Sequence, residues 1–203
     1  MPGTRRLLVV ASRNPHKVEE IRAILEGLPF QVASVTELGE FPEVVEDGKS
    51  FAENARKKAV QTMTWVRELV VADDSGLEVD ALDGAPGVHS ARFAAEPGMP
   101  SSDAANNAKL LRLMADVPPE RRGAQFRCVI ALAVPGGEVH FSEGICRGQI
   151  AYEPQGAHGF GYDPLFIVPE LGMTFAQLGP EVKNRISHRA RALAGLKQLL
   201  GQL

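Results

Sequence analysis

Short apolar runs alternate with amphipathic helical patterns along this chain, and this alternation restricts the possible folds most. The apolar runs have the length of strands and cover residues 5–12, 30–35, 69–72 and 124–134. After the first run, Asn14-Pro15 supplies an N-cap and a first-turn proline, and Gly27 ends the helix that they begin. No change of composition marks a linker. The pattern therefore predicts one α/β domain over residues 1–203.

The remaining segments fit the same alternation. Ser50 and Glu53 have the spacing of a capping box, which predicts a helix after the acidic segment 36–49. Further helices are expected from Asp103 onward and over residues 188–200. The other expected elements are a short strand or hairpin arm over 77–82, a long loop over 83–102, a strand over 138–150 that pairs with 124–134 as a hairpin, and a glycine-rich loop that runs into a strand over 156–169.

Charge and composition exclude several classes of function. The 203 residues carry a formal net charge of −3 and no run of basic residues, which argues against a general nucleic-acid-binding surface. No apolar stretch has the length of a transmembrane helix, and the N-terminal apolar run is too short for a signal peptide. Cys128 and Cys146 form neither a disulfide framework nor a zinc motif. We expect a soluble cytoplasmic protein that binds neither nucleic acid nor membranes.

Four polar clusters interrupt the apolar elements, and the first is Ser12 to Lys17. It joins a strand end to a helix N-terminus, where backbone N–H groups and the helix dipole favour an anion such as phosphate. Lys17 adds a full positive charge. The segment lacks the GxxxxGK[ST] pattern of a P-loop. Taken alone, the cluster is more typical of an ordinary capped helix with an exposed lysine.

The second cluster is the carboxylate pair Asp73-Asp74, which is expected to end the strand 69–72. Adjacent residues on a strand point to opposite faces, so the two side chains need not share one site. A buried carboxylate is costly unless it is paired, and Mg²⁺ binds carboxylate oxygens together with water and substrate phosphate. The pair therefore indicates either a metal-binding carboxylate or a turn that ends the strand.

The third and fourth clusters are GFGYDP at 159–164 and KNRISHRAR at 183–191. Phe160 and Tyr162 offer rings that could stack on a base, although core aromatic residues in a turn are the more common reading. In the fourth cluster, cationic side chains lie near an expected helix N-terminus, where positive charge opposes the helix dipole. An anion nearby would explain them. Together the four clusters predict a magnesium-dependent enzyme that acts on a nucleotide.

Four sequence blocks in the same order resemble the inosine/xanthosine triphosphate pyrophosphatase family. They are SRNPHKVEEI, ADDSGLEVDALDGAPGVHSARFA, HGFGYDPLF and KNRISHRARAL, and the resemblance runs from about residue 8 to residue 194. It implies a single elongated α/β domain of two lobes around a mixed sheet, with the active site in the cleft between the lobes. It also implies a homodimer that uses Mg²⁺ to hydrolyse ITP, dITP or XTP to the monophosphate and pyrophosphate.

The resemblance also implies roles for individual residues. Glu46 and Asp74 match the metal-binding residues, and Asp74 matches the proposed general base. The positions that match substrate-binding residues are Ser12, Asn14 and Lys17 for the triphosphate, Ser75, and Phe160, Gly161, Tyr162, Asp163, Lys183, His188 and Arg189 for the nucleoside. Hypoxanthine and xanthine carry a 6-oxo acceptor, so a fixed donor such as Arg189 or a loop N–H would favour them over adenine.

Several alternatives stay open at this stage. Arg13 stands where the family often has glycine, so its side chain either points away or adds a phosphate contact. Glu43 and Asp47 lie close to Glu46 and compete for its metal role. A related pyrophosphatase for pyrimidine or modified nucleotides, of the Maf-like group, and a non-catalytic nucleotide sensor are the rival functions. A Rossmann dehydrogenase is disfavoured because no GxGxxG follows the first strand.

Overall fold

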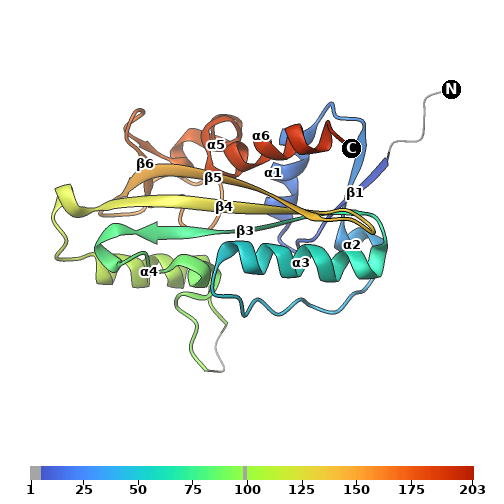
Figure 1. Ribbon diagram of the computed structural model, residues 1–203. Helices are drawn as coiled ribbons and strands as arrows, with labels where there is room; N and C mark the ends of the chain where they lie inside the picture. Colours follow the sequence, from blue (N-terminus) through green and yellow to red (C-terminus); the bar gives the residue numbers. More distant parts are fainter. Residues whose placement is uncertain (1–5, 98–99) are drawn as a thin grey trace. The chain divides into compact units, whose positions relative to one another are not determined.

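The structure is a computed structural model that describes residues 6–97 and 100–203 (Figure 1). Its sheet has the strand order β2-β1-β3-β4-β5-β6-β7. The strands are β1 (Arg6–Val10), β2 (Phe30–Ser34), β3 (Leu69–Val79), β4 (Gly123–Ala133), β5 (Val139–Ile150), β6 (Phe166–Val168) and β7 (Met173–Thr174). Strand β1 pairs in parallel with β2 and β3, whereas β6 is antiparallel to β5 and β7. The predicted α/β class with a mixed sheet is confirmed.

The chain divides into two compact units. The first comprises the residues up to Asp74 together with Cys128–Gly144 and Arg191–Leu203. The second comprises Ser75–Arg127 and Ile145–Ala190. The location of the active site in a cleft between two lobes stays a prediction.

In the first unit, helices cover both faces of the parallel strands. Helix α1 (Pro15–Leu25) and the part of α6 (His188–Leu200) from Arg191 onward pack on one face, and α3 (Phe51–Val66) covers the other (Figure 1). Alternation along β1 and β3 supplies both faces with apolar side chains. The core between the sheet and α1 and α6 includes Leu8, Val10, Ile21, Leu25, Leu69, Val71, Ile130, Leu193 and Leu196.

The predicted helix starts of the first unit are confirmed. The Asn14 side chain accepts hydrogen bonds from the backbone N–H groups of His16 and Lys17, and Pro15 is the first helical residue. Ser50 caps α3 by accepting the Glu53 N–H at 3.2 Å. The Glu53 carboxylate accepts from the backbone of Lys49 instead of Ser50, so the capping box closes one residue earlier than expected. A four-residue helix, α2 (Val35–Leu38), stands in the segment predicted as acidic turns.

The second unit has its own core of aromatic and aliphatic side chains. Phe126 lies 4.6 Å from Phe166 and 6.0 Å from Phe175 between ring centroids, and α4 (Asp103–Leu113) adds Leu110. Helix α5 (Phe175–Ile186) packs here and is absent from the sequence prediction. Its Gly179-Pro180 pair explains the omission, because Gly179 has a φ of 76° and kinks the helix.

The strand that carries the paired aspartates is longer than predicted. Strand β3 runs from Leu69 to Val79, so it passes through Asp73 and Asp74 instead of ending at them. The segment 77–82 becomes the end of β3 followed by a short 3₁₀ turn over Asp80–Leu82. The loop 83–102 contains a second 3₁₀ turn, Gly87–Arg92. The expectation of a turn at the aspartates is therefore wrong.

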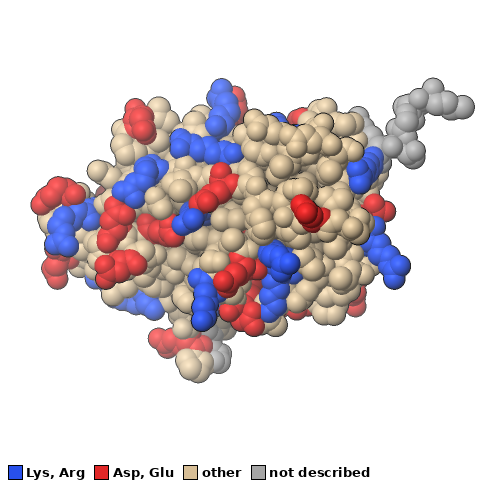
Figure 2. All heavy atoms as spheres, viewed as in Figure 1, with Lys and Arg blue, Asp and Glu red and all other residues tan. Residues whose placement is uncertain are grey.

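Surface charges of both signs are mixed on the face shown in Figure 2, where Lys and Arg side chains lie among Asp and Glu side chains. Among the ion pairs of exposed side chains is that of Arg147 and Asp80, with a nitrogen–oxygen distance of 2.6 Å. No helix in the described part of the chain is long and apolar enough to span a membrane.

Candidate active site

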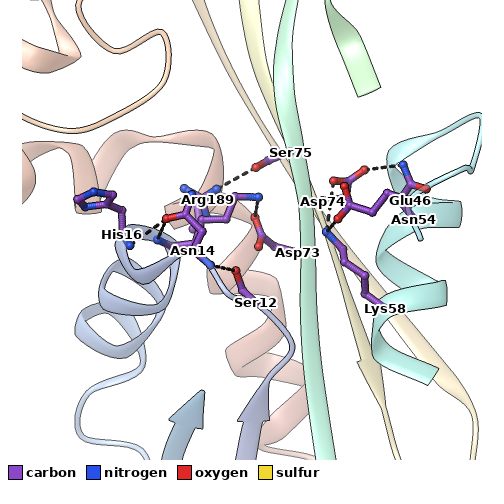
Figure 3. A network of polar contacts seen from close by, with 11 residues as sticks. Ser12, Asn14, His16, Glu46, Asn54, Lys58, Asp73, Asp74, Ser75 and Arg189 are labelled. Atoms are coloured by element: carbon purple, nitrogen blue, oxygen red, sulfur yellow. Dashed lines mark hydrogen bonds and ion pairs between the residues drawn. The ribbon is translucent and has the colours of Figure 1, made fainter. Parts of the chain in front are cut away.

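Asp73 and Asp74 point to opposite sides of β3 (Figure 3). The Asp73 carboxylate meets Lys17 of α1, with Nζ 3.1 Å from Oδ2. The Asp74 carboxylate meets α3, where Asn54 Nδ2 donates to Oδ2 at 3.1 Å and Lys58 Nζ lies 3.4 Å from Oδ1. Both aspartates are buried. The predicted separation of the pair follows from strand alternation and is confirmed.

The acidic loop before α3 brings one of its carboxylates to Asp74. Lys58 Nζ lies 2.6 Å from Glu46 Oε1, so Glu46 and Asp74 share one ammonium group (Figure 3). Asp47 instead pairs with Lys57 at 2.6 Å, and Glu43 is exposed. Of Glu43, Glu46 and Asp47, the three candidates for the metal role, Glu46 is the one that shares Lys58 with Asp74.

The Asn54 side chain connects this loop to β3 by hydrogen bonds. Its Oδ1 accepts the Gly48 N–H at 2.8 Å, while its Nδ2 holds Asp74, and the whole side chain is buried. Asn54 and Lys58 were not singled out from the sequence. They lie four residues apart and so share a helix face, and Asn54 belongs to the buried residues of this helix together with Ala55 and Ala59. Polar residues on an otherwise apolar face were the signal that could have identified both.

Gly48 has no room for a side chain at this junction. A Cβ there would lie 2.6 Å from Asn54 Oδ1 and 2.9 Å from Glu53 Cβ. We expect Gly48→Ala to push the loop from α3 and lower the free energy of unfolding by about 1–3 kcal/mol, measured by urea denaturation. Gly137→Ala is the control, because its Cβ would make ordinary contacts from 3.4 Å. Equal stability of the two variants would contradict the tight junction.

The charges around Asp74 act on each other strongly. Burial raises the pKa of Asp74, and the positive charges of Lys58 and Lys17 only partly oppose this effect. Burial also disfavours the charge of Lys58, but the carboxylates of Asp74, Asp73 and Glu46 raise the pKa of Lys58 overall. Lys58 is therefore a cation at neutral pH. Because a raised pKa means a stronger base, the ionised Asp74 carboxylate is a better proton acceptor than an ordinary aspartate.

The carboxylate pair fits a hard divalent cation that is completed by substrate. Mg²⁺ is typically bound by one or two carboxylates together with waters and phosphate oxygens. Glu46 and Asp74 meet at one ammonium group and supply two such carboxylates. In residues 6–97 and 100–203, no group of three or more His, Cys, Asp or Glu side chains could hold a metal ion. The donor set is thus suited to Mg²⁺ with a phosphate ligand and not to an all-protein metal cage.

The predicted triphosphate segment is organised around the start of α1. Ser12 Oγ accepts the Asn14 N–H at 3.2 Å, and Asn14 in turn caps the helix. The Lys17 ammonium pairs with the Asp73 carboxylate, and a sixth of the Lys17 side chain is exposed. Arg13 donates to the Phe41 carbonyl, so its side chain is turned to the acidic loop, and Phe41 stacks on Trp65. Ser12, Asn14 and Lys17 therefore lie together in the first unit, as predicted.

A second polar cluster lies wholly in the second unit. Lys183 Nζ is 2.6 Å from Asp163 Oδ2, and both side chains are buried. Arg189, which is 1% exposed, donates to Ser75 Oγ at 2.9 Å (Figure 3). The half-buried Phe160 ring lies 4.5 Å from the Lys183 nitrogen and 5.8 Å from the Arg189 guanidinium. Lys183, His188 and Arg189 of the basic segment are therefore buried, and Asp163 is the anion beside Lys183.

Tyr162 and His188 are core residues of the second unit. The Tyr162 hydroxyl donates to the Ser90 carbonyl at 2.8 Å, and burial raises the pKa of this phenol. The His188 ring stacks on Phe126 with centroids 4.7 Å apart. Phe160 is thus the ring of this loop that retains an exposed part. The substrate contacts expected of Tyr162 and His188 stay predictions.

The backbone of the loop 159–163 is already engaged. The Phe160 N–H donates to Asp163 Oδ2 at 3.0 Å, and the Gly161 N–H donates to Asp103 Oδ2 at 2.7 Å. The sequence left two donors open for reading a 6-oxo group, namely Arg189 or a loop N–H. These two N–H groups already have carboxylate acceptors within the chain, and the choice of donor for a 6-oxo group stays a prediction.

Comparisons with known proteins show the family of this chain. The model of the Ham1 family matches residues 8–199. A protein of Desulforamulus reducens named dITP/XTP pyrophosphatase is 54% identical over 97% of this chain and 96% of its own length. One of the same name from Geobacter sulfurreducens is 55% identical over 96% of each chain.

Solved structures give the same result. The Ham1 protein of Staphylococcus aureus has a TM-score of 0.85 at 41% identity, covering 97% of this chain and 99% of that chain. A HAM1 protein from Coxiella burnetii has a TM-score of 0.87 at 38% identity, covering 98% and 100%. Matches of this extent in both sequence and structure show that the chain belongs to the Ham1 family.

Proposed function

We propose that this chain hydrolyses noncanonical purine nucleoside triphosphates, namely ITP, dITP and XTP, to the monophosphate and pyrophosphate. The observation that carries the proposal is the cluster of Asp74, Glu46 and Lys58 on one side of β3, with the Lys17–Asp73 pair on the other side of the strand. Three carboxylates and two ammonium groups around one short stretch of strand suit a metal-bound polyphosphate. The relatives named dITP/XTP pyrophosphatase support the substrate class.

Glu46 and Asp74 would hold Mg²⁺, which supplies charge neutralisation for the triphosphate when it is bound. The chain's own groups do the remaining work. Asp74 accepts a proton from the attacking water, whose oxygen bonds to the α-phosphorus. The bond from that phosphorus to the bridging oxygen breaks, and pyrophosphate leaves with the electron pair. Lys17 and Lys58 stabilise the negative charge that develops on this leaving group.

The second-unit cluster is proposed to bind the nucleoside. Phe160 offers a ring to the base, and Arg189 offers N–H donors to the 6-oxo group of hypoxanthine or xanthine. Lys183 is committed to Asp163 in this unit, so its proposed role is to hold the loop that carries Phe160. Adenine has a 6-amino donor, and facing Arg189 it would leave buried donors unsatisfied, at a cost of about 1–3 kcal/mol.

Pyrophosphate release over a nucleotide panel tests the function. We expect rapid release from ITP, dITP and XTP with Mg²⁺, little release from ATP, and loss of activity when a chelator removes the metal. Equal rates on ATP would reject the base-edge argument. Preference for pyrimidine or modified nucleotides would favour a Maf-like activity, and nucleotide binding without pyrophosphate release would favour a sensor.

The family resemblance further supports two proposals about the setting of the enzyme. We propose a homodimer, which sedimentation of the purified chain would detect as twice the mass of 21.9 kDa. We also propose a cytoplasmic location, where the nucleotide pool is found.

A further inference from the structure

We infer that Asp103 and Asn107 of α4 are positioning residues that fix Gly161 and thereby set how tightly the second unit holds a purine base. This inference rests on the proposed function, in which the loop 159–163 binds the nucleoside. Neither residue lies in the four sequence clusters. Both reach the loop from a helix to which no function has been assigned.

The two side chains hold both polar groups of one residue. Asp103 Oδ2 accepts the Gly161 N–H at 2.7 Å, and Asn107 Nδ2 donates to the Gly161 carbonyl at 2.9 Å. Asp103 and Asn107 are four residues apart, so they lie on the same face of the helix. The loop is therefore attached to α4 by a pair of matched hydrogen bonds at a single residue.

Gly161 depends on these bonds for its position. Its φ of 60° lies in the left-handed region, and a Cβ there would meet nothing within 4 Å. Glycine is thus required for the backbone conformation and not for space. With no side chain to pack, the residue is held in place through its backbone.

The Asn107 side chain makes this hydrogen bond through its amide nitrogen. It is buried, and its Oδ1 has no hydrogen-bond partner in the described part of the chain, while its Nδ2 binds Gly161. A buried polar group without a partner is uncommon and calls for an explanation. Here the explanation is that the amide nitrogen is needed as a donor to the Gly161 carbonyl, and the oxygen belongs to the same amide group.

The position of Gly161 controls its neighbour Phe160. The Phe160 N–H is tied to Asp163, and on the other side Tyr162 is tied to Ser90. Phe160 is therefore a half-buried ring on a loop that is anchored at Phe160, Gly161 and Tyr162, with Lys183 and Arg189 beside the ring. Release of Gly161 would let the ring leave the place where a base stacks.

Binding of inosine monophosphate and of pyrophosphate to the full chain separates this role from a general one. Asn107→Asp keeps the size of the side chain but sets an acceptor against the Gly161 carbonyl. By calorimetry with Mg²⁺ present, we expect the Kd of inosine monophosphate to rise about tenfold, as for the loss of one hydrogen bond, and that of pyrophosphate to stay unchanged. In turnover of ITP, KM rises and kcat is retained.

Asn106→Asp is the matched control. Asn106 is the neighbouring buried asparagine, and its Nδ2 donates to the Ala91 carbonyl in a different segment. It should bind inosine monophosphate like the wild type. Asp103→Ala, at an exposed residue, is expected to weaken this ligand several-fold, and it decides the question if Asn107→Asp does not fold.

Two results would overturn the inference. One is wild-type affinity for inosine monophosphate in the Asp103 and Asn107 variants. The other is an equal loss of affinity in Asn106→Asp. These affinities do not require turnover, so a wild-type chain that binds inosine monophosphate without hydrolysing ITP would reject the proposed function alone.

Discussion

Asp74→Asn is expected to lower kcat for ITP by roughly 10²–10⁴-fold, the usual contribution of a general base. The amide keeps the shape of the side chain and can still contact Asn54 and Lys58, but it cannot take a proton from water. The fold should be retained, because the raised pKa of Asp74 shows that its negative charge is costly in the buried site. Steady-state pyrophosphate release measures the loss, and far-UV circular dichroism checks the fold.

Asp73→Asn is the control one residue away. Asp73 is equally buried but faces Lys17 on the other side of β3. We expect this variant to act only indirectly, through Lys17, so kcat for ITP falls far less than in Asp74→Asn. If Asp73→Asn loses as much kcat as Asp74→Asn, the two aspartates do not have separate roles.

Lys183→Met is expected to have the largest effect on stability. The Lys183–Asp163 pair is 2.6 Å long, and the two side chains are 4% and 2% exposed. Removing one partner of a buried ion pair leaves a charge without its compensation and typically lowers the free energy of unfolding by about 3–5 kcal/mol. Urea denaturation followed by circular dichroism measures the change.

Arg185→Met provides the comparison on the same helix. Arg185 pairs with Glu181 at 3.5 Å, and both side chains are largely exposed, so we expect a change within about 0.5 kcal/mol. The double variant Lys183→Met, Asp163→Leu should recover part of the stability, because no buried charge remains. If Lys183→Met is as stable as Arg185→Met, the buried pair does not stabilise the second unit.

Local rules predicted the parts of the fold that local residues determine. Asn14-Pro15 and Ser50 identified two helix starts because caps act within one turn. Alternation predicted that Asp73 and Asp74 would face opposite ways. The same rules placed the end of the strand wrongly, because Lys17, Asn54 and Lys58 stabilise carboxylates that would otherwise terminate it. Partners so distant in sequence are not visible from local patterns.

The candidate site was predicted unevenly for a similar reason. Family resemblance named Glu46 among three acidic residues, and the shared Lys58 gives the physical basis for that choice. Residues that support the site from within helices, such as Asn54, were not found, because they carry no motif. The kink at Gly179-Pro180 kept α5 out of the sequence prediction, so neither the helix that carries Lys183 nor its buried ion pair with Asp163 was predicted.

Lys58 gives the catalytic centre an internal counterion. Its side chain is 11% exposed and lies between Glu46 and Asp74, so these carboxylates have a positive neighbour before any metal arrives. In many small metalloproteins the site does not exist before the ion binds, so the ion is needed for folding. In this fold Lys58 already neutralises part of the charge of Glu46 and Asp74, so the proposed Mg²⁺ would be required for the reaction and not for folding.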